Sequence, residues 1–77
     1  MDTKEIGNRL IELRGDRTQL QVATDNGLSV SAIGMYERGE RIPRDEIKVR
    51  LARYYEKTVE YIFFNQNDTD SVGGAKA

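Results

Sequence analysis

Apolar residues recur every three or four positions through most of the first 64 residues, and this spacing predicts helices. The clearest runs are Ile6, Leu10 and Leu13 near the amino terminus and Ile47 and Leu51 in the second half. No stretch alternates apolar and polar residues for long enough to predict a strand. We therefore expect an all-α fold.

Capping residues and glycines divide these runs into five short helices. A side chain that can accept a hydrogen bond from a first-turn N–H stands before four of them: Asp2, Thr18, Ser29 and Thr58. Pro43 suits the threshold of the remaining helix. Glycines that can end a helix follow the first three, at Gly15, Gly27 and Gly39. In the third helix we expect Ile33 and Tyr36 to face inward, with Val30 at the margin. The apolar residues of the second, fourth and fifth helices are Leu20, Val22 and Ala23; Ile47, Leu51 and Tyr54 or Tyr55; and Val59, Ile62 and Phe63.

The chain of 77 residues suits one small domain with one core. We expect that domain to span residues 1–64. Residues 65–77 are polar and follow no period, so we expect them to form a mobile tail. No apolar run approaches the roughly 18 residues that cross a bilayer.

Two residue types are missing, and their absence limits the chemistry. Without cysteine there is no disulfide framework or thiolate metal site, which suits a reducing cytoplasm. Without histidine the commonest general base and metal ligand is absent. We therefore expect neither an enzyme nor a bound metal or cofactor.

Charge is unevenly distributed along the chain. The formal net charge is -1, which argues against indiscriminate binding to nucleic acid. Residues 36–57 nevertheless hold seven basic and five acidic residues. The basic ones are Arg38, Arg41, Arg44, Lys48, Arg50, Arg53 and Lys57.

Two short expected helices are joined across a glycine turn, which is the pattern of a helix-turn-helix. Ala23 lies four residues before Gly27, and Ile33 lies six residues after it. The stretches "TQLQVATDNGLSVSAIGMYERGERIP" and "LARYYEKTVEYIFF" resemble the Cro/C1-type, or Xre-like, helix-turn-helix family. This resemblance implies a compact five-helix, lambda-repressor-like DNA-binding domain, with the motif at about residues 18–38.

The chain departs from the family pattern at two places. Between Arg14 and Gln19 it has only "GDRT", about two residues shorter than the usual link, so we expect a tight connection. Asp45 stands where the family commonly has an apolar residue, so the start of the fourth helix departs from the family pattern while its middle follows it.

The resemblance implies that the helix at residues 29–38 lies in the major groove of double-stranded DNA. Its candidate base readers are Val30, Ser31, Gly34 and Met35. Val30 can equally belong to the core, and a methionine at helical spacing is often packing material. None of these four side chains reads guanine or adenine bidentately, so we expect contact with thymine methyl groups and, at Gly34, close approach to DNA.

Residues around this helix are candidates for the DNA backbone. The resemblance implies phosphate contacts for Gln19, Ser29, Arg38, Arg41 and Arg44. An ordinary surface residue at Gln19 and a solvated charged face at the arginines are the alternatives.

Two further pairs of residues have expected structural roles. By the family pattern, Arg14 and Glu37 form a buried ion pair. Tyr61 and Phe64 are candidates for a two-fold contact, because Phe63 and Phe64 in succession cannot both face one core.

The function implied is a sequence-specific regulator of transcription, most simply a repressor of phage, mobile-element or bacterial genes. It would act as a homodimer on a palindromic operator. The alternative is a helix-turn-helix antitoxin or another module that binds protein.

Overall fold

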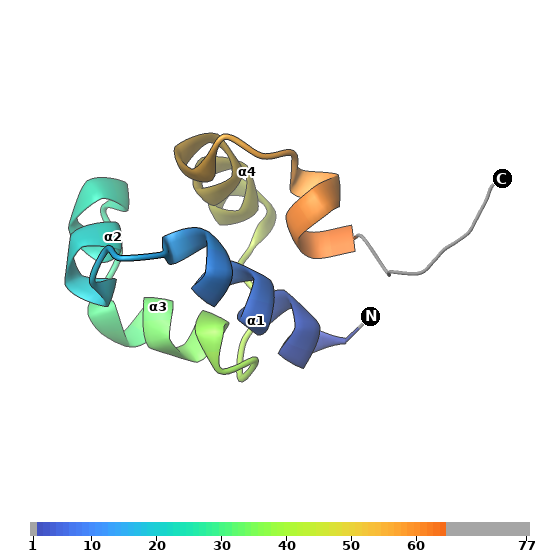
Figure 1. Ribbon diagram of the computed structural model, residues 1–77, viewed down its shortest axis with the longest axis horizontal. Helices are drawn as coiled ribbons and strands as arrows, with labels where there is room; N and C mark the ends of the chain where they lie inside the picture. Colours follow the sequence, from blue (N-terminus) through green and yellow to red (C-terminus); the bar gives the residue numbers. More distant parts are fainter. Residues whose placement is uncertain (1, 65–77) are drawn as a thin grey trace, which may run out of the picture.

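The computed structural model describes residues 2–64, which form five helices and no strand (Figure 1). In chain order the helices are α1 (Thr3–Arg14), α2 (Gln19–Asn26), α3 (Val30–Glu37), α4 (Asp45–Tyr55) and a short π-helix, η1 (Glu60–Phe64). The expected all-α class is confirmed. The expected tail at residues 65–77 lies outside the described residues.

The helices pack around α1 and α2. α1 contacts α3 and η1, while α2 contacts α3 and α4. Figure 1 shows α1 running across the middle of the molecule, with α3 on one side of it and α4 on the other. α1 therefore contacts two helices, α3 and η1, that lie far from it in the sequence.

Side-chain caps begin the first three helices where the sequence predicts them. Asp2 accepts a first-turn N–H of α1 at 2.9 Å. The hydroxyls of Thr18 and Ser29 do the same for α2 and α3, each at 3.0 Å. Gly27 then ends α2 in the left-handed conformation, with φ 66°. Local chemistry thus sets the bounds of the helix-turn-helix.

The start of α4 is formed without a side-chain cap. The residue before the helix, Arg44, makes no capping hydrogen bond. Pro43 is buried, and its ring fixes the φ angle of the backbone that leads into α4. Asp45 and Glu46 place negative charge at the positive end of the helix dipole. The departure from the family pattern at Asp45 therefore leaves α4 intact.

All five helices contribute to one hydrophobic core. Its largest fully buried side chains are Phe63, Leu51, Ile62 and Val22. Leu20, an apolar residue of α2, lies outside this core and is 63% exposed. The other buried apolar residues are Ile6, Leu10, Ala23, Ile33, Tyr36, Ile47, Ala52 and Tyr55.

The fifth helix differs from the expected α-helix, since Glu60–Phe64 forms a π-helix. Thr58 caps it as expected, accepting the N–H of Tyr61 at 2.9 Å. Arg9 Nη1 donates to the carbonyl of Ile62 at 2.7 Å, which satisfies a backbone acceptor of this short element. Ile62 and Phe63 are consecutive yet 0% and 1% exposed. The hydrogen bond from Arg9 and the burial of both Ile62 and Phe63 favour the turn of a π-helix, which is wider than that of an α-helix.

Gly7 allows α1 to approach the end of α3 closely. A Cβ at this position would lie 2.9 Å from the carbonyl carbon of Glu37 and 3.1 Å from the amide nitrogen of Gly39. Both are backbone atoms, which cannot move without moving the helix end. The apolar pattern contains no sign of this contact, because a glycine in a helix has no side chain to mark the buried face.

We predict that Gly7→Ala destabilises the protein, although alanine is the better helix former. The added methyl must push α1 and α3 apart, which should lower the free energy of unfolding by about 1–3 kcal/mol. Gly34→Ala on α3 is the matched control, because the atoms nearest to its Cβ belong to the flexible end of Arg38. That variant should be more stable by up to about 1 kcal/mol. Urea unfolding followed by circular dichroism measures both, and equal changes of the same sign would contradict the role of Gly7.

Candidate nucleic-acid interface

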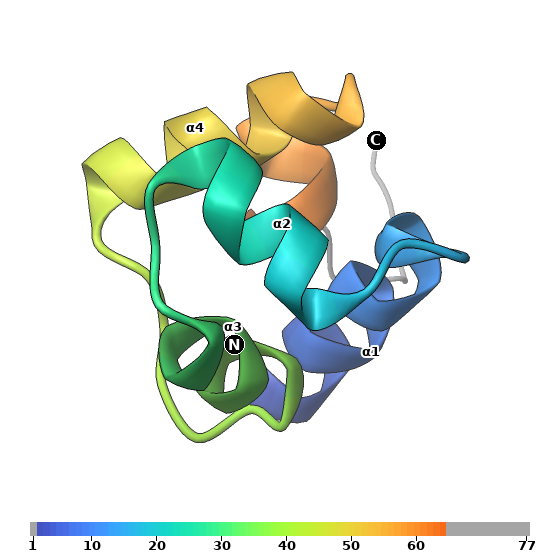
Figure 2. The ribbon, with the colours of Figure 1, turned by 90° about the vertical axis from the view of Figure 1, so that its left-hand side faces the viewer.

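The helix-turn-helix is built from α2, the turn at Gly27 and α3. The N–H of Leu28 bonds to the carbonyl of Ala23 at 2.8 Å and so closes the turn. Ala23 and Ile33 are both buried in the common core. Figure 2 shows α3 at the edge of the molecule, below α2 and beside α1, with its outer side uncovered by the other described helices.

The outer side of α3 carries the four candidate base readers, and we call it the reading face: Val30, Ser31, Gly34 and Met35. Val30 is 41% exposed and so lies outside the core. Ser31 is exposed and Met35 is half-buried. Gly34, in contrast, is buried. Three of the four candidates are therefore accessible.

Arg38, an expected backbone contact, lies over the fourth candidate, Gly34. A Cβ at Gly34 would lie only 2.9 Å from Nη1 of Arg38 and 3.6 Å from its Cζ. Arg38 Nε and Nη2 also donate to the two carboxylate oxygens of Glu40 at 3.0 and 3.2 Å. These hydrogen bonds raise the pKa of Arg38 and lower the pKa of Glu40, so both stay charged at neutral pH. Gly34 is thus not open, and the reading face carries an arginine fork.

Behind the reading face, a buried carboxylate joins three segments. Glu37, whose side chain is 4% exposed, accepts from Arg14 Nε at 2.8 Å. Its other oxygen accepts from Gln19 Nε2 at 2.9 Å. The hydrogen bond to Glu37 is the main cause that raises the pKa of Arg14. The expected pair of Arg14 and Glu37 is present, and Gln19 braces the same carboxylate.

Four candidate backbone-contacting residues precede or follow α3 in the chain. Ser29 uses its oxygen as a cap, which leaves its O–H free to donate. Gln19 gives one N–H of its amide to Glu37 and keeps the second. Arg41 and Arg44 are exposed, and neither forms a side-chain hydrogen bond or ion pair with another residue of 2–64. These donors are available to an anion.

A second set of contacts, not foreseen from the sequence, fixes α2 to α4. Arg50 Nη1 donates to the carbonyl of Asn26 at 2.9 Å, at the end of α2. The hydroxyl of Tyr54 donates to Asp25 at 2.6 Å, which raises the pKa of Tyr54. The guanidinium of Arg17 lies 5.3 Å from the ring centroid of Tyr54. Arg50 therefore stabilises the packing of α4 against α2. Its partner could not be predicted, because no sequence signal shows where so long a side chain will bond.

The buried carboxylate generates a prediction for stability. Arg14→Ala should lower the free energy of unfolding by about 3–5 kcal/mol, because it leaves the charge of Glu37 buried beside a single amide. Glu37→Ala should cost less, since the side chain of Arg14 is 21% exposed and can be hydrated. Urea unfolding tests both variants.

The exposed pair of Arg38 and Glu40 offers a control for the same measurement. Glu40→Ala should leave the unfolding midpoint nearly unchanged, because surface ion pairs contribute little. Midpoints of Arg14→Ala and Glu37→Ala as close to the wild type as that of Glu40→Ala would contradict a structural role for the pair.

Other kinds of site find little support in the part of the chain that the structure describes. None of its helices has the length and apolar character to span a membrane. The same residues bring together no group of three acidic side chains that could hold a metal ion. Among residues 2–64, the reading face and its arginines are the main candidate site.

Comparison with known families identifies the class of the fold. The model of a helix-turn-helix family matches residues 10–62, from the second half of α1 into η1, and so covers more than half of the chain. No curated protein and no solved structure matches the sequence. With α2 and α3 arranged as described, the chain belongs to the Cro/C1-type, Xre-like helix-turn-helix family of DNA-binding regulators.

Proposed function

We propose that this protein is a sequence-specific regulator of transcription, a repressor of phage, mobile-element or bacterial genes. The observation that carries the proposal is the uncovered outer side of α3, followed along the chain by Arg41 and Arg44, which are exposed and unpaired within residues 2–64. A helix of this kind fits the major groove, and the arginines suit phosphate oxygens. Repression then follows from occupying a promoter.

The apolar residues of the reading face contribute part of the specificity. Val30 and Met35 contact thymine methyl groups, and the hydroxyl of Ser31 bonds a base edge. Gln19, Ser29, Arg41 and Arg44 bind phosphates and set the register of α3. Arg38 stands apart from these backbone contacts, because its fork is held by Glu40.

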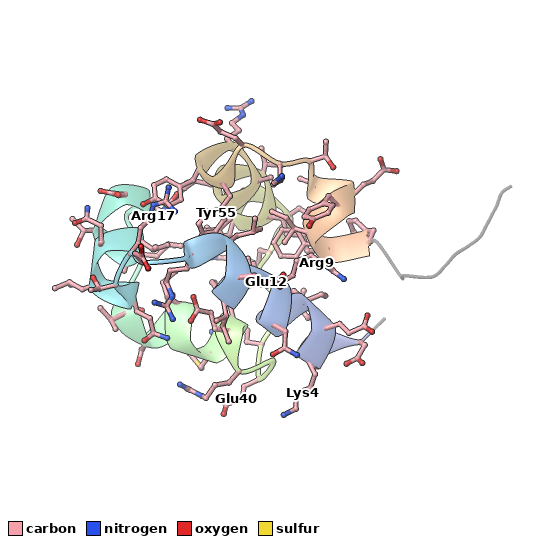
Figure 3. All side chains as sticks on the ribbon, viewed as in Figure 1. Lys4, Arg9, Glu12, Arg17, Glu40 and Tyr55 are labelled. Atoms are coloured by element: carbon pink, nitrogen blue, oxygen red, sulfur yellow. The ribbon has the colours of Figure 1, made fainter. Side chains whose placement is uncertain are left out.

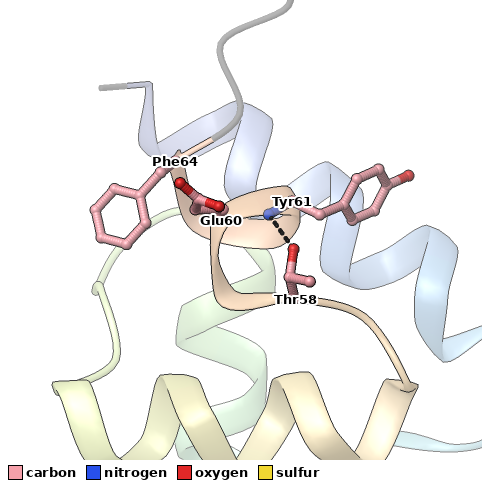
Figure 4. A pocket seen from close by; sticks show the side chains of 4 residues that line it. All are labelled: Thr58, Glu60, Tyr61 and Phe64. Carbon is pink, nitrogen blue, oxygen red and sulfur yellow. Dashed lines mark hydrogen bonds between the residues drawn. The ribbon is translucent and has the colours of Figure 1, made fainter.

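A single helix contacts few base pairs, so useful specificity requires two copies on a palindromic operator. We place the contact between the copies at η1. Tyr61 and Phe64 are 40% and 46% exposed there. Together with Thr58 and Glu60 they line an open hollow of about 290 Å³ (Figure 4). Apolar surface of this limited extent suits a dimer that is weak in solution and formed firmly on DNA.

The function is tested by selecting duplexes from random DNA and titrating the selected one by fluorescence. The selected duplex should bind at least about 10³-fold more tightly than a scrambled duplex of equal length at physiological salt. Absence of any specific affinity would overturn the proposal. It would favour a protein-binding module such as an antitoxin, for which the 63% exposed Leu20 is the supporting observation.

The salt dependence of the same titration tests the arginines. With about two to four phosphates neutralised per subunit, log affinity should fall by roughly 0.9 per phosphate as log salt rises. Arg41→Ala and Arg44→Ala should each weaken all sequences alike and reduce the slope by about one. Arg53→Ala, which removes an exposed arginine of α4, is the control with an unchanged slope. If both Arg41→Ala and Arg44→Ala keep the wild-type slope, neither arginine contacts DNA.

The placement of the dimer contact is tested separately. Phe64→Ala and Tyr61→Ala should weaken self-association in sedimentation and abolish cooperative binding to the two half-sites. Binding to a single half-site should be unchanged. Ile11→Ala, which trims a side chain of similar exposure on α1, should associate as the wild type does. Wild-type association of both aromatic variants would refute the contact at η1.

A further inference from the structure

The arginine on the reading face is unusual in having a carboxylate as a fixed partner. Glu40 takes the edge of the Arg38 guanidinium formed by Nε and Nη2. Both side chains are more than half exposed, at 58% and 55%, so burial does not force them together. Their pairing leaves the fork over Gly34, at the centre of the reading face.

The fork retains donors after Glu40 is bound. A guanidinium has five N–H groups, and Glu40 occupies two of them. The end edge, made by Nη1 and Nη2, keeps two N–H groups side by side. No residue of 2–64 accepts a hydrogen bond from Nη1. Two parallel donors match the O6 and N7 acceptors that guanine presents in the major groove.

We propose that Arg38 reads a guanine in each half-site, that Glu40 is its positioning residue, and that Gly34 provides the space in which the fork lies. The inference rests on the proposed function and adds to it a specificity-determining residue. It changes the expected readout, since the reading face then combines an arginine–guanine contact with contacts to thymine methyls.

The charge of Glu40 explains why the target is a base and not a phosphate. A phosphate bound at the free edge would lie close to the carboxylate, and the two negative charges would repel each other. The guanine edge is neutral and offers two acceptors, so no such repulsion opposes it. A carboxylate on one edge of the fork therefore favours a base on the other.

The backbone around Glu40 is fixed, which allows it to hold Arg38 in place. Its N–H bonds to the carbonyl of Met35 at 2.9 Å and closes the end of α3. Gly39 has φ 75° and lies so near α1 that a Cβ there would be 2.9 Å from the carbonyl oxygen of Thr3. Figure 3 shows Glu40 on the outer side of this turn, pointing away from the other helices.

The test compares the duplexes selected by the wild type and by variants of Arg38. The wild type should select one fixed guanine per half-site, and replacing it should weaken binding by about 5- to 100-fold. Replacing that guanine by 7-deazaguanine, which lacks the N7 acceptor, should also weaken wild-type binding. Arg38→Ala should lose both effects, and Arg38→Lys should retain only part of the preference because lysine has no fork. Arg53→Ala should keep the preference.

Variants of the neighbours test the positioning role. Glu40→Gln and Glu46→Gln each remove one exposed negative charge, so both should raise affinity for DNA in general. Only Glu40→Gln should also reduce the guanine preference several-fold. Gly34→Ala should reduce it too, because the added methyl displaces Nη1 of Arg38.

The outcomes separate this inference from the function on which it rests. If the wild type selects no sequence, the proposed function fails and the inference fails with it. If the wild type selects a site but Arg38→Ala weakens all sequences by one factor, Arg38 binds phosphate and only the inference is overturned. If Glu40→Gln and Glu46→Gln change the guanine preference equally, the positioning role of Glu40 is overturned.

Discussion

The hydrogen bonds of the buried Glu37 carboxylate hold α3 in its orientation relative to α1 and α2. The carboxylate accepts hydrogen bonds from Arg14 at the end of α1 and from Gln19 at the start of α2, while Glu37 itself ends α3. A buried charge tolerates little displacement, because any loss of its partners leaves it without solvent or compensation. The carboxylate therefore fixes α3 relative to two other helices without using its outer side. Gly7 reinforces this restraint, since α1 meets the backbone of Glu37 where a methyl group has no room.

The boundaries of the fold follow from local chemistry and were predictable for that reason. Capping at Ser29 and the left-handed turn at Gly27 depend on neighbours within a few residues, so the sequence contains the whole cause. The pair of Arg14 and Glu37 was predictable only through the family pattern, because 23 positions separate its members. The π form of η1 and the bond of Arg50 to Asn26 depend on tertiary contacts, and nothing near these residues in the sequence indicates them.

The candidate site also combines features that follow from local sequence with features that depend on tertiary contacts. Val30 and Ser31 lie on the outer side of α3, as helical spacing requires. Gly34 was expected to allow close approach to DNA, because it has no side chain. Its cover comes from Arg38, one helical turn later, whose side chain turns back toward the start of α3. Which way a long side chain lies depends on its partner, and Glu40 gains that role from the turn at Gly39. The pattern of residue types therefore predicts neither the direction of the Arg38 side chain nor its pairing with Glu40.

Under the proposed function, the distribution of charge affects how well the protein can discriminate among DNA sequences. Non-specific affinity for DNA comes from cations that neutralise phosphates, and a net charge of -1 keeps that contribution small. Of the arginines near α3, Arg38 is paired with an acid, whereas Arg41 and Arg44 are unpaired within residues 2–64. In the proposed complex, the small number of free cations lowers the affinity for every sequence alike. The fork restrained by Glu40 adds a penalty that is larger for a wrong base than for a right one. Specificity is a ratio of affinities, so an acidic residue beside the reading face strengthens discrimination even as it weakens binding.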